Sequence, residues 1–135
     1  MLSKPISNNP WPCLRWIQQE EKTFEGRLRP KVIEWGLSVG TIMHFFDLTD
    51  PHSWVICRVT TLLEFKDFGE AFDALGSSLI PGHTKEEVIR LYNIFQKAED
   101  EDLDILGSTP CRAIRENGVV AIGILVLTKN YVPSI

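Results

Sequence analysis

The stretch Glu21-Lys22-Thr23-Phe24-Glu25-Gly26-Arg27-Leu28 decides the fold. Small or apolar residues occupy its even positions from 24 to 28, and polar residues occupy the odd positions from 23 to 27. Side chains of a strand point to opposite faces at every second residue, so this period of two predicts a strand. We expect Phe24 and Leu28 to face a core, while Glu25 and Arg27 share the opposite face.

The flanking segments predict a mixture of helices and strands. Residues 11–21 carry apolar side chains at helical spacing after Pro10 and predict a short helix. Capping signals at Asp67 and Thr84 predict two further helices, the second with an apolar stripe of Val88, Leu91, Tyr92 and Phe95. Strands are expected at 41–46, 54–65 and 118–127. This order favours an α+β fold with a small curled sheet or barrel and helices at one side.

Length and charge limit the possible functions. A chain of 135 residues suits one domain, and the proline-containing residues 1–10 predict a flexible N-terminal arm before a domain at 11–129. The net charge of −4 argues against a protein that binds duplex nucleic acid through a basic face. Residues 1–40 nevertheless carry more Lys and Arg than Glu, which weakly favours a phosphate-bearing ligand.

The sequence predicts neither a membrane span nor a metal site. The longest apolar run, 118–127, is well short of the roughly 20 residues that cross a bilayer. We expect a cytoplasmic protein, with the nucleus open to it by diffusion. Cys13, Cys57 and Cys111 are widely spaced and form no CxxC pair, and the histidines lack the spacing of metal ligands. Reduced thiols and no metal or other cofactor are therefore predicted.

The stretch 21–28 resembles the signature of ASCH domains, in which a strand with the pattern G-x-K-T-x-E-x-R follows the first helix. Further segments are similar to family patterns in the same order, at 37–42, 65–68, 79–82, 92–95 and 118–122. The resemblance covers about residues 12–127 and implies a PUA-like small β-barrel with flanking helices and a cleft between them. Since the part between Phe95 and Gly118 is longer than in the family, we predict an acidic insertion at about 99–116.

The resemblance also implies a set of functions. ASCH proteins are associated with RNA binding, with RNA processing and, in small bacterial members, with hydrolysis of the amide of acetylated cytidine. Those amidohydrolases use a Lys, a Thr three residues later and a Glu from the helical region. Lys22 matches the Lys, but Glu25 stands at the position of the Thr, and no equivalent of the Glu is found near Pro81.

Three functions follow in order of preference. The first is a binding module for single-stranded RNA or a modified nucleoside. The second is an enzyme, either a metal-independent ribonuclease or an N4-acetylcytidine-type amidohydrolase, with Lys22 and Glu25 as catalytic groups. The third is a protein-interaction domain whose acidic insertion docks a basic partner.

The candidate residues suit a nucleotide. Arg27 can make two parallel hydrogen bonds to a phosphate or a base edge, and Glu25 can accept from an exocyclic amine. Lys22 has the wrong parity for that face and can join it only at the start of the strand, as a phosphate anchor or, with a lowered pKa, as a general base. The competing interpretation is an ordinary surface ion pair between Glu25 and Arg27, with Lys22 in solvent.

Other candidates are less specific. Tyr92 lies on the apolar stripe and is either a core aromatic or a cleft residue that stacks on a base. Arg58 is a possible second phosphate contact within a strand, and Thr23 shares the polar face of the 22–28 strand. Trp11 is a possible lid.

Overall fold

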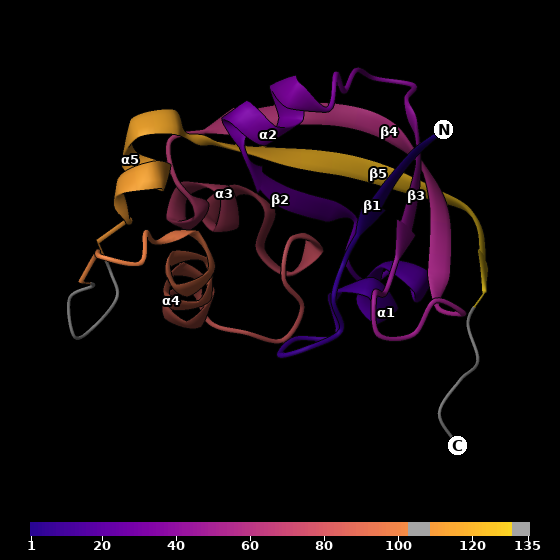
Figure 1. The fold of residues 1–135 in the computed structure, drawn as a ribbon, viewed down its shortest axis with the longest axis horizontal. Coiled ribbons are helices and arrows are strands. Elements are labelled where there is room, and N and C mark those ends of the chain that lie inside the picture. The colour runs from indigo at the N-terminus through magenta and orange to yellow at the C-terminus, as the bar shows by residue number, and fades with distance from the viewer. Residues whose placement is uncertain (103–108, 131–135) are drawn as a thin grey trace.

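A curled sheet forms the fold, with the helices of residues 68–75, 85–96 and 112–117 gathered at one end of it (Figure 1). The computed structural model describes residues 1–102 and 109–130. The strands are β1 (Leu2–Pro5), β2 (Phe24–Leu28), β3 (Ile42–Phe46), β4 (Trp54–Phe65) and β5 (Val119–Asn130). The helices are α1 (Cys13–Gln18), α2 (Arg29–Glu34), α3 (Phe68–Leu75), α4 (Lys85–Gln96) and α5 (Arg112–Asn117), with a 3-10 turn, η1 (Gly76–Ser78).

The sheet has the strand order β1-β3-β4-β5-β2. β1 pairs with β3 in parallel, and every other neighbouring pair is antiparallel. The two long strands β4 and β5 form the centre, and register shifts near Ile56 and Val59 interrupt their ladder. Such irregularities bend and twist a sheet, which fits its curled shape.

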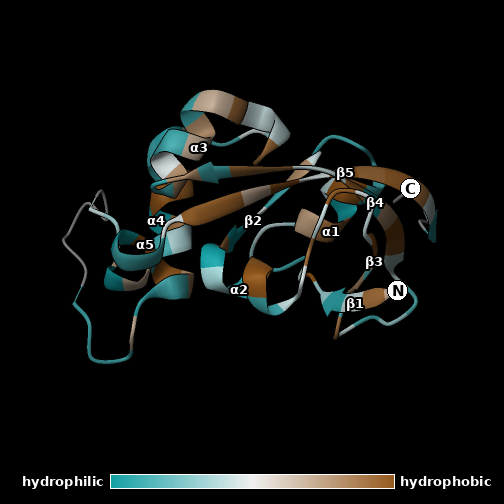
Figure 2. Cartoon of the chain, turned by 90° about the horizontal axis from the view of Figure 1, so that it is seen from above, coloured by the Kyte–Doolittle hydropathy of each residue, from teal (hydrophilic) through white to brown (hydrophobic). Residues whose placement is uncertain are grey.

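Two hydrophobic cores hold the chain together. The first lies inside the curled sheet, where Val55, Cys57 and Val59 are fully buried at alternate positions of β4. The second joins the sheet to α3, α4 and α5 and includes Phe68, Tyr92 and other side chains of these helices. In Figure 2 the long strands are largely brown and α5 is mostly teal, so apolar residues follow the sheet and polar residues cover this helix.

Helices α3 and α4 begin where the sequence predicts. The Asp67 side chain accepts a hydrogen bond of 2.8 Å from the Glu70 amide at the start of α3. At the start of α4, Thr84 and Glu87 make both bonds of a capping box. The helices then pack together through stacked rings, since Phe68 of α3 and Tyr92 of α4 are parallel with centroids 3.6 Å apart.

The α+β class is confirmed, with two corrections in detail. The sheet is curled but not closed into a barrel, because β1 and β2 are its two edges and no pairing joins them within the described residues. The predicted flexible arm is not free of the fold, since Leu2–Pro5 forms β1 and pairs with β3. A proline is compatible with this position because an edge strand leaves amide groups unpaired.

Some elements differ from the sequence prediction. The helices α2 and α5 were not predicted, and Phe95, expected on the apolar stripe of α4, is 55% exposed. Of the predicted insertion at 99–116, residues 103–108 lie outside the described residues, and 112–117 form α5. No helix in the described part of the chain has the length and apolar character needed to cross a membrane.

Candidate functional site

A cleft of about 250 Å³ opens between the two edges of the sheet and α4. Its walls come from segments far apart in the sequence: the end of β1 and the loop after it, α1, β2, the turn before α4, and α4 itself. The lining residues are Pro5, Ile6, Ser7, Asn9, Pro10, Trp11, Cys13, Glu25, Gly26, Arg27, Ile80, Leu91, Tyr92, Phe95 and Gln96. This is the predicted position, between the curled sheet and the helices.

Glu25 forms the centre of a charge cluster on the cleft wall. The residue is only 4% exposed, so its carboxylate is removed from bulk water. Its Oε1 atom lies 2.9 Å from Nη1 of Arg27 and 3.8 Å from Nζ of Lys22, and it accepts a hydrogen bond of 3.0 Å from the Gly26 amide. Desolvation raises the pKa of this carboxyl, but Arg27, Lys22 and the Gly26 amide outweigh it, and the pKa is lowered.

Lys22 belongs to this cluster but lies on the side of Glu25 that faces away from the cleft. The residue is 1% exposed, and its ammonium group donates a hydrogen bond to the Leu79 carbonyl in the turn between α3 and α4. Because Lys22 precedes β2, its side chain does not follow the alternation of that strand. It can therefore reach Glu25, as the sequence predicted for a residue at the start of the strand. However, it does not line the cleft. Its position is suited to hold Glu25 and the turn together and not to touch a ligand.

Arg27 lies at the edge of the cleft with part of its charge accessible. Its side chain is 23% exposed, and Nη1 donates to both the Glu25 carboxylate and the Gly26 carbonyl, each at 2.9 Å. The guanidinium carbon also lies 5.8 Å from the centroid of the Trp35 ring, a cation–π distance. These contacts hold the guanidinium in place, and within residues 1–102 and 109–130 its other N–H groups have no hydrogen-bond partner and can reach a ligand.

Gly26 allows β2 to approach the aromatic pair closely. A Cβ atom at this position would lie 2.6 Å from Cε1 of Phe68 and 2.9 Å from Oη of Tyr92. Burial raises the pKa of Tyr92 well above its ordinary value, and the charge of Glu25 adds to the shift. The Tyr92 hydroxyl is therefore neutral and can donate a hydrogen bond. The sequence did not predict this role for Gly26, because only the packing reveals it.

Aromatic and thiol groups complete the wall. The indole of Trp11 stacks on the imidazole of His83 with centroids 4.4 Å apart, which ties the loop after β1 to the turn before α4. Cys13 also lines the cleft, and burial raises the pKa of its thiol to about 11, with a contribution from the charge of Glu25. The thiol is therefore protonated at neutral pH, which makes it a poor nucleophile.

Besides Lys22, two predicted site residues do not line the cleft. Arg58 is an exposed residue of β4 and does not line the cleft. Thr23 precedes β2, and its backbone amide and carbonyl bond to Ser78 and Ile124, so it supports the fold. Conversely, Cys13 and the residues 5–10 that line the cleft were not predicted, because only the three-dimensional path of the chain brings them close to Glu25; Trp11, named as a possible lid, does line the cleft.

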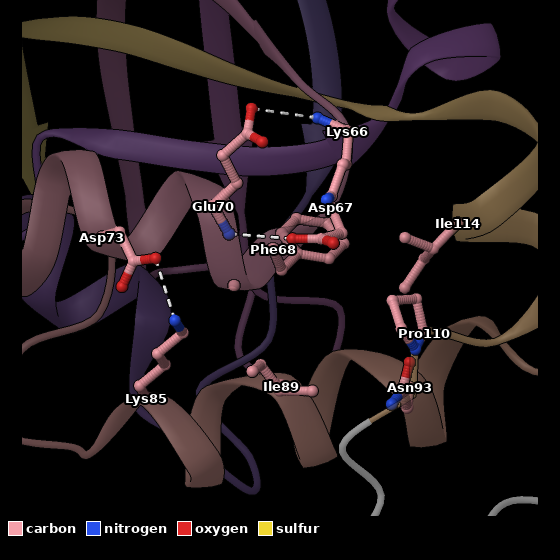
Figure 3. Close-up of a pocket in the computed structure, with 11 residues that line it drawn as sticks. Lys66, Asp67, Phe68, Glu70, Asp73, Lys85, Ile89, Asn93, Pro110 and Ile114 are labelled. Carbon is pink, nitrogen blue, oxygen red and sulfur yellow. Dashed lines mark hydrogen bonds and ion pairs between the residues drawn. The ribbon is translucent and has the colours of Figure 1, made fainter.

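A second cavity, of about 320 Å³, lies between α3 and α4 (Figure 3). Most of its polar side chains are already engaged in the fold. Asp67 caps α3, and Lys85 binds Asp73 at 2.8 Å. Asn93 donates to the Thr109 carbonyl and accepts from the Cys111 amide. Although it is the larger space, its chemistry is explained by helix capping and packing, so the cleft beside Glu25 is the better candidate site.

The described residues contain no group of three or more His, Cys, Asp and Glu side chains placed to hold a metal ion. Within the same residues, Cys13, Cys57 and Cys111 are free thiols.

Two solved structures resemble this fold over nearly the whole chain. The crystal structure of the hypothetical protein PH0355 is 18% identical with a TM-score of 0.67, and the match covers 93% of this chain and 98% of that chain. The solution NMR structure of PF0455 from Pyrococcus furiosus is 23% identical with a TM-score of 0.64, and the match covers 93% of this chain and 96% of that chain. No protein-family model matches this chain, and no curated protein matches it significantly. At these identities the likeness establishes the fold alone.

Proposed function

We propose that this chain is an ASCH-type, PUA-like domain that binds RNA or a modified nucleotide by taking one nucleoside unit into the cleft. The observation that carries the proposal is the cluster of Lys22, Glu25 and Arg27, in which a buried carboxylate and a partly exposed guanidinium lie side by side on the cleft wall. The strand signature that resembles ASCH domains supplies these same residues.

The size and lining of the cleft support a ligand of this kind. A volume of about 250 Å³ is slightly below the roughly 300–1,000 Å³ of typical small-molecule sites, which suits a single nucleoside better than several stacked bases. Trp11 and Tyr92 offer aromatic surface, while Glu25 and Arg27 offer an acceptor beside a donor. Lys22 and Arg27 together outweigh the single charge of Glu25, so the cluster is net positive and compatible with a nearby phosphate.

The protonation states favour binding over catalysis. A lowered pKa makes Glu25 a weak base, and a pKa of about 11 keeps the Cys13 thiol protonated. Lys22, the residue that matches the amidohydrolase lysine, is enclosed behind Glu25 and does not line the cleft. Hydrolysis of RNA or of an acetylated cytidine by Lys22 and Glu25 is therefore the less favoured proposal, and docking of a basic protein on the acidic segment is a further one.

Binding is tested with the four ribonucleosides by calorimetry and with a labelled single-stranded RNA of mixed sequence by fluorescence anisotropy. We expect RNA affinity to fall between about 50 mM and about 200 mM salt, since phosphates are engaged. Arg27→Ala should weaken binding about tenfold, whereas the matched control Arg58→Ala changes an exposed arginine outside the cleft and should have little effect. Absence of binding to every nucleoside and to the RNA at low salt would refute the proposal, as would equal binding by both variants.

A further inference from the structure

Trp35 holds two cations beside the cleft. This residue follows the last residue of α2, is partly buried and packs against the first hydrophobic core. Nζ of Lys4 lies 4.9 Å from the centroid of its ring, and the guanidinium carbon of Arg27 lies 5.8 Å from the same centroid. Lys4 belongs to β1 and Arg27 to β2, so the ring connects the two edges of the sheet where both of them contribute to the lining of the cleft.

Both cations have donors that the protein does not use. Among residues 1–102 and 109–130, the ammonium group of Lys4 forms neither an ion pair nor a hydrogen bond. Lys4 is partly exposed, and no fully buried side-chain nitrogen in this part of the chain lacks a partner, so Nζ is open to solvent. The same reasoning applies to Nε and Nη2 of Arg27, because every contact of this guanidinium with an oxygen atom is made by Nη1.

The positive charges at this position exceed the negative ones. The single charge of Glu25 is shared between Lys22 and Arg27. Lys4 adds a further positive charge, which no ion pair in the described part of the chain offsets. A cation–π contact leaves that charge in place, because an aromatic ring has no net charge. Cations held near one another favour the binding of an anion, which reduces their mutual repulsion.

We infer that Lys4, Arg27 and Trp35 form a phosphate subsite at the mouth of the cleft, and that the ligand is a nucleotide whose base enters the cleft while its phosphate binds the two cations. This inference rests on the proposed function and assigns the phosphate of its ligand to named residues. Arg27 offers planar N–H groups that match two phosphate oxygens. Lys4 offers a compact charge on a flexible four-carbon stem, which lets Nζ move toward the same phosphate.

The interior of the cleft is unsuited to the phosphate itself. Ile6, Ile80 and Tyr92 line the cleft and are buried, so its deep part is mainly apolar. A phosphate placed among these side chains would lose its hydration without gaining a cation. A base, by contrast, gains from contact with apolar and aromatic surface. The base and the phosphate of a nucleotide are thereby assigned to different parts of the site.

A purely structural role for the two cations makes a different prediction. If Trp35, Lys4 and Arg27 serve only to connect β1 with β2, the loss of the Lys4 charge lowers the stability of the site and affects every ligand alike. If they bind phosphate, the loss affects only ligands that carry a phosphate. Two ligands that differ by this group alone therefore distinguish the two roles.

The test compares the unaltered protein with Lys4→Gln by calorimetric titration of the four ribonucleosides, their 5′-monophosphates and their 3′-monophosphates. In the unaltered protein, a phosphate at one of the two positions should raise affinity about tenfold or more, and the gain should shrink as salt rises. Lys4→Gln should lower the affinity for that monophosphate about fivefold and change nucleoside affinity less than about twofold. Lys4→Arg should retain the gain. The matched control Lys31→Gln changes an exposed lysine of α2 that pairs with Glu34, and it should leave every affinity unchanged.

The labelled single-stranded RNA distinguishes the source of the phosphate. If its affinity also falls in Lys4→Gln, the subsite takes an internal phosphodiester, and if only the monophosphates respond, it takes a terminal phosphate. Equal affinity for each nucleoside and both of its monophosphates at low salt would overturn the inference and leave the proposed function intact. So would an unchanged monophosphate affinity in Lys4→Gln, or an equal loss for nucleosides and monophosphates in the folded variant. Absence of binding by nucleosides, monophosphates and RNA would overturn both.

Discussion

Replacing Lys22 by methionine should destabilise the protein far more than the same replacement of an exposed lysine. The ammonium group is fully buried, lies 3.8 Å from Oε1 of Glu25 and donates to the Leu79 carbonyl. Loss of that donor costs about 1–3 kcal/mol, and removal of one partner of a buried ion pair costs about 3–5 kcal/mol. Arg27 remains 2.9 Å from the carboxylate, so Glu25 is not left alone. We therefore expect a loss of about 3 kcal/mol in the free energy of unfolding at pH 7.

The loss should also depend on pH, with a sign set by Glu25. Since the pKa of this carboxyl is lowered in the folded state, its ionisation stabilises the protein above the usual pKa of about 4.3, and the stabilisation is lost as the pH falls through the lowered pKa. Lys22→Met raises that pKa and reduces this contribution. The difference in the free energy of unfolding between wild type and variant is therefore largest near neutral pH and becomes smaller in acid.

Urea denaturation at pH 7 and in acid measures both effects. The matched control is Lys85→Met, which removes an exposed ion pair with Asp73 and should change the stability much less. A loss below about 1 kcal/mol at pH 7, or a difference that does not narrow in acid, would refute the reasoning that Lys22 supports Glu25 electrostatically.

Three further substitutions give distinct results. Gly26→Ala places a Cβ 2.6 Å from Phe68 and should destabilise the protein by about 1–3 kcal/mol and weaken nucleoside binding, as thermal denaturation and calorimetry will show. Tyr92→Phe removes a hydroxyl without a protein partner in the described chain, so stability should hardly change while nucleoside affinity falls several-fold in calorimetry. Thr84→Ala removes the capping box of α4 and should cost about 1 kcal/mol in urea denaturation, with nucleoside affinity unchanged.

The strand β2 shows what the sequence could predict. The alternation at 23–28 located it, and the parity argument correctly brought Glu25 and Arg27 together. It left open whether the face that carries Glu25 lines a cleft or meets solvent. The curl of the sheet and the loop after β1 cover this face, so Glu25 and Lys22 are buried, and the competing interpretation of a surface ion pair with a solvated Lys22 is wrong.

The contacts between segments that are distant in the chain could not be predicted from the sequence. Local alternation gives no sign that Leu2–Pro5 pairs with β3, because this pairing joins segments about forty residues apart in the chain. The apolar stripe on α4 correctly predicted that Val88 and Tyr92 are buried. It did not show that Phe95 is exposed and lines the cleft. Arg58 was chosen for its residue type within a strand, and the register places it on an exposed face.

The most direct measurement is a titration of the ¹⁵N-labelled protein with cytidine, followed by NMR. The amide shifts should change at Glu25, Gly26 and Arg27, at Tyr92 and around Trp11, which line or adjoin the cleft. Shift changes confined to the cavity around Phe68 and Lys85, or none with any nucleoside, would contradict the claim that the cleft beside Glu25 is the binding site.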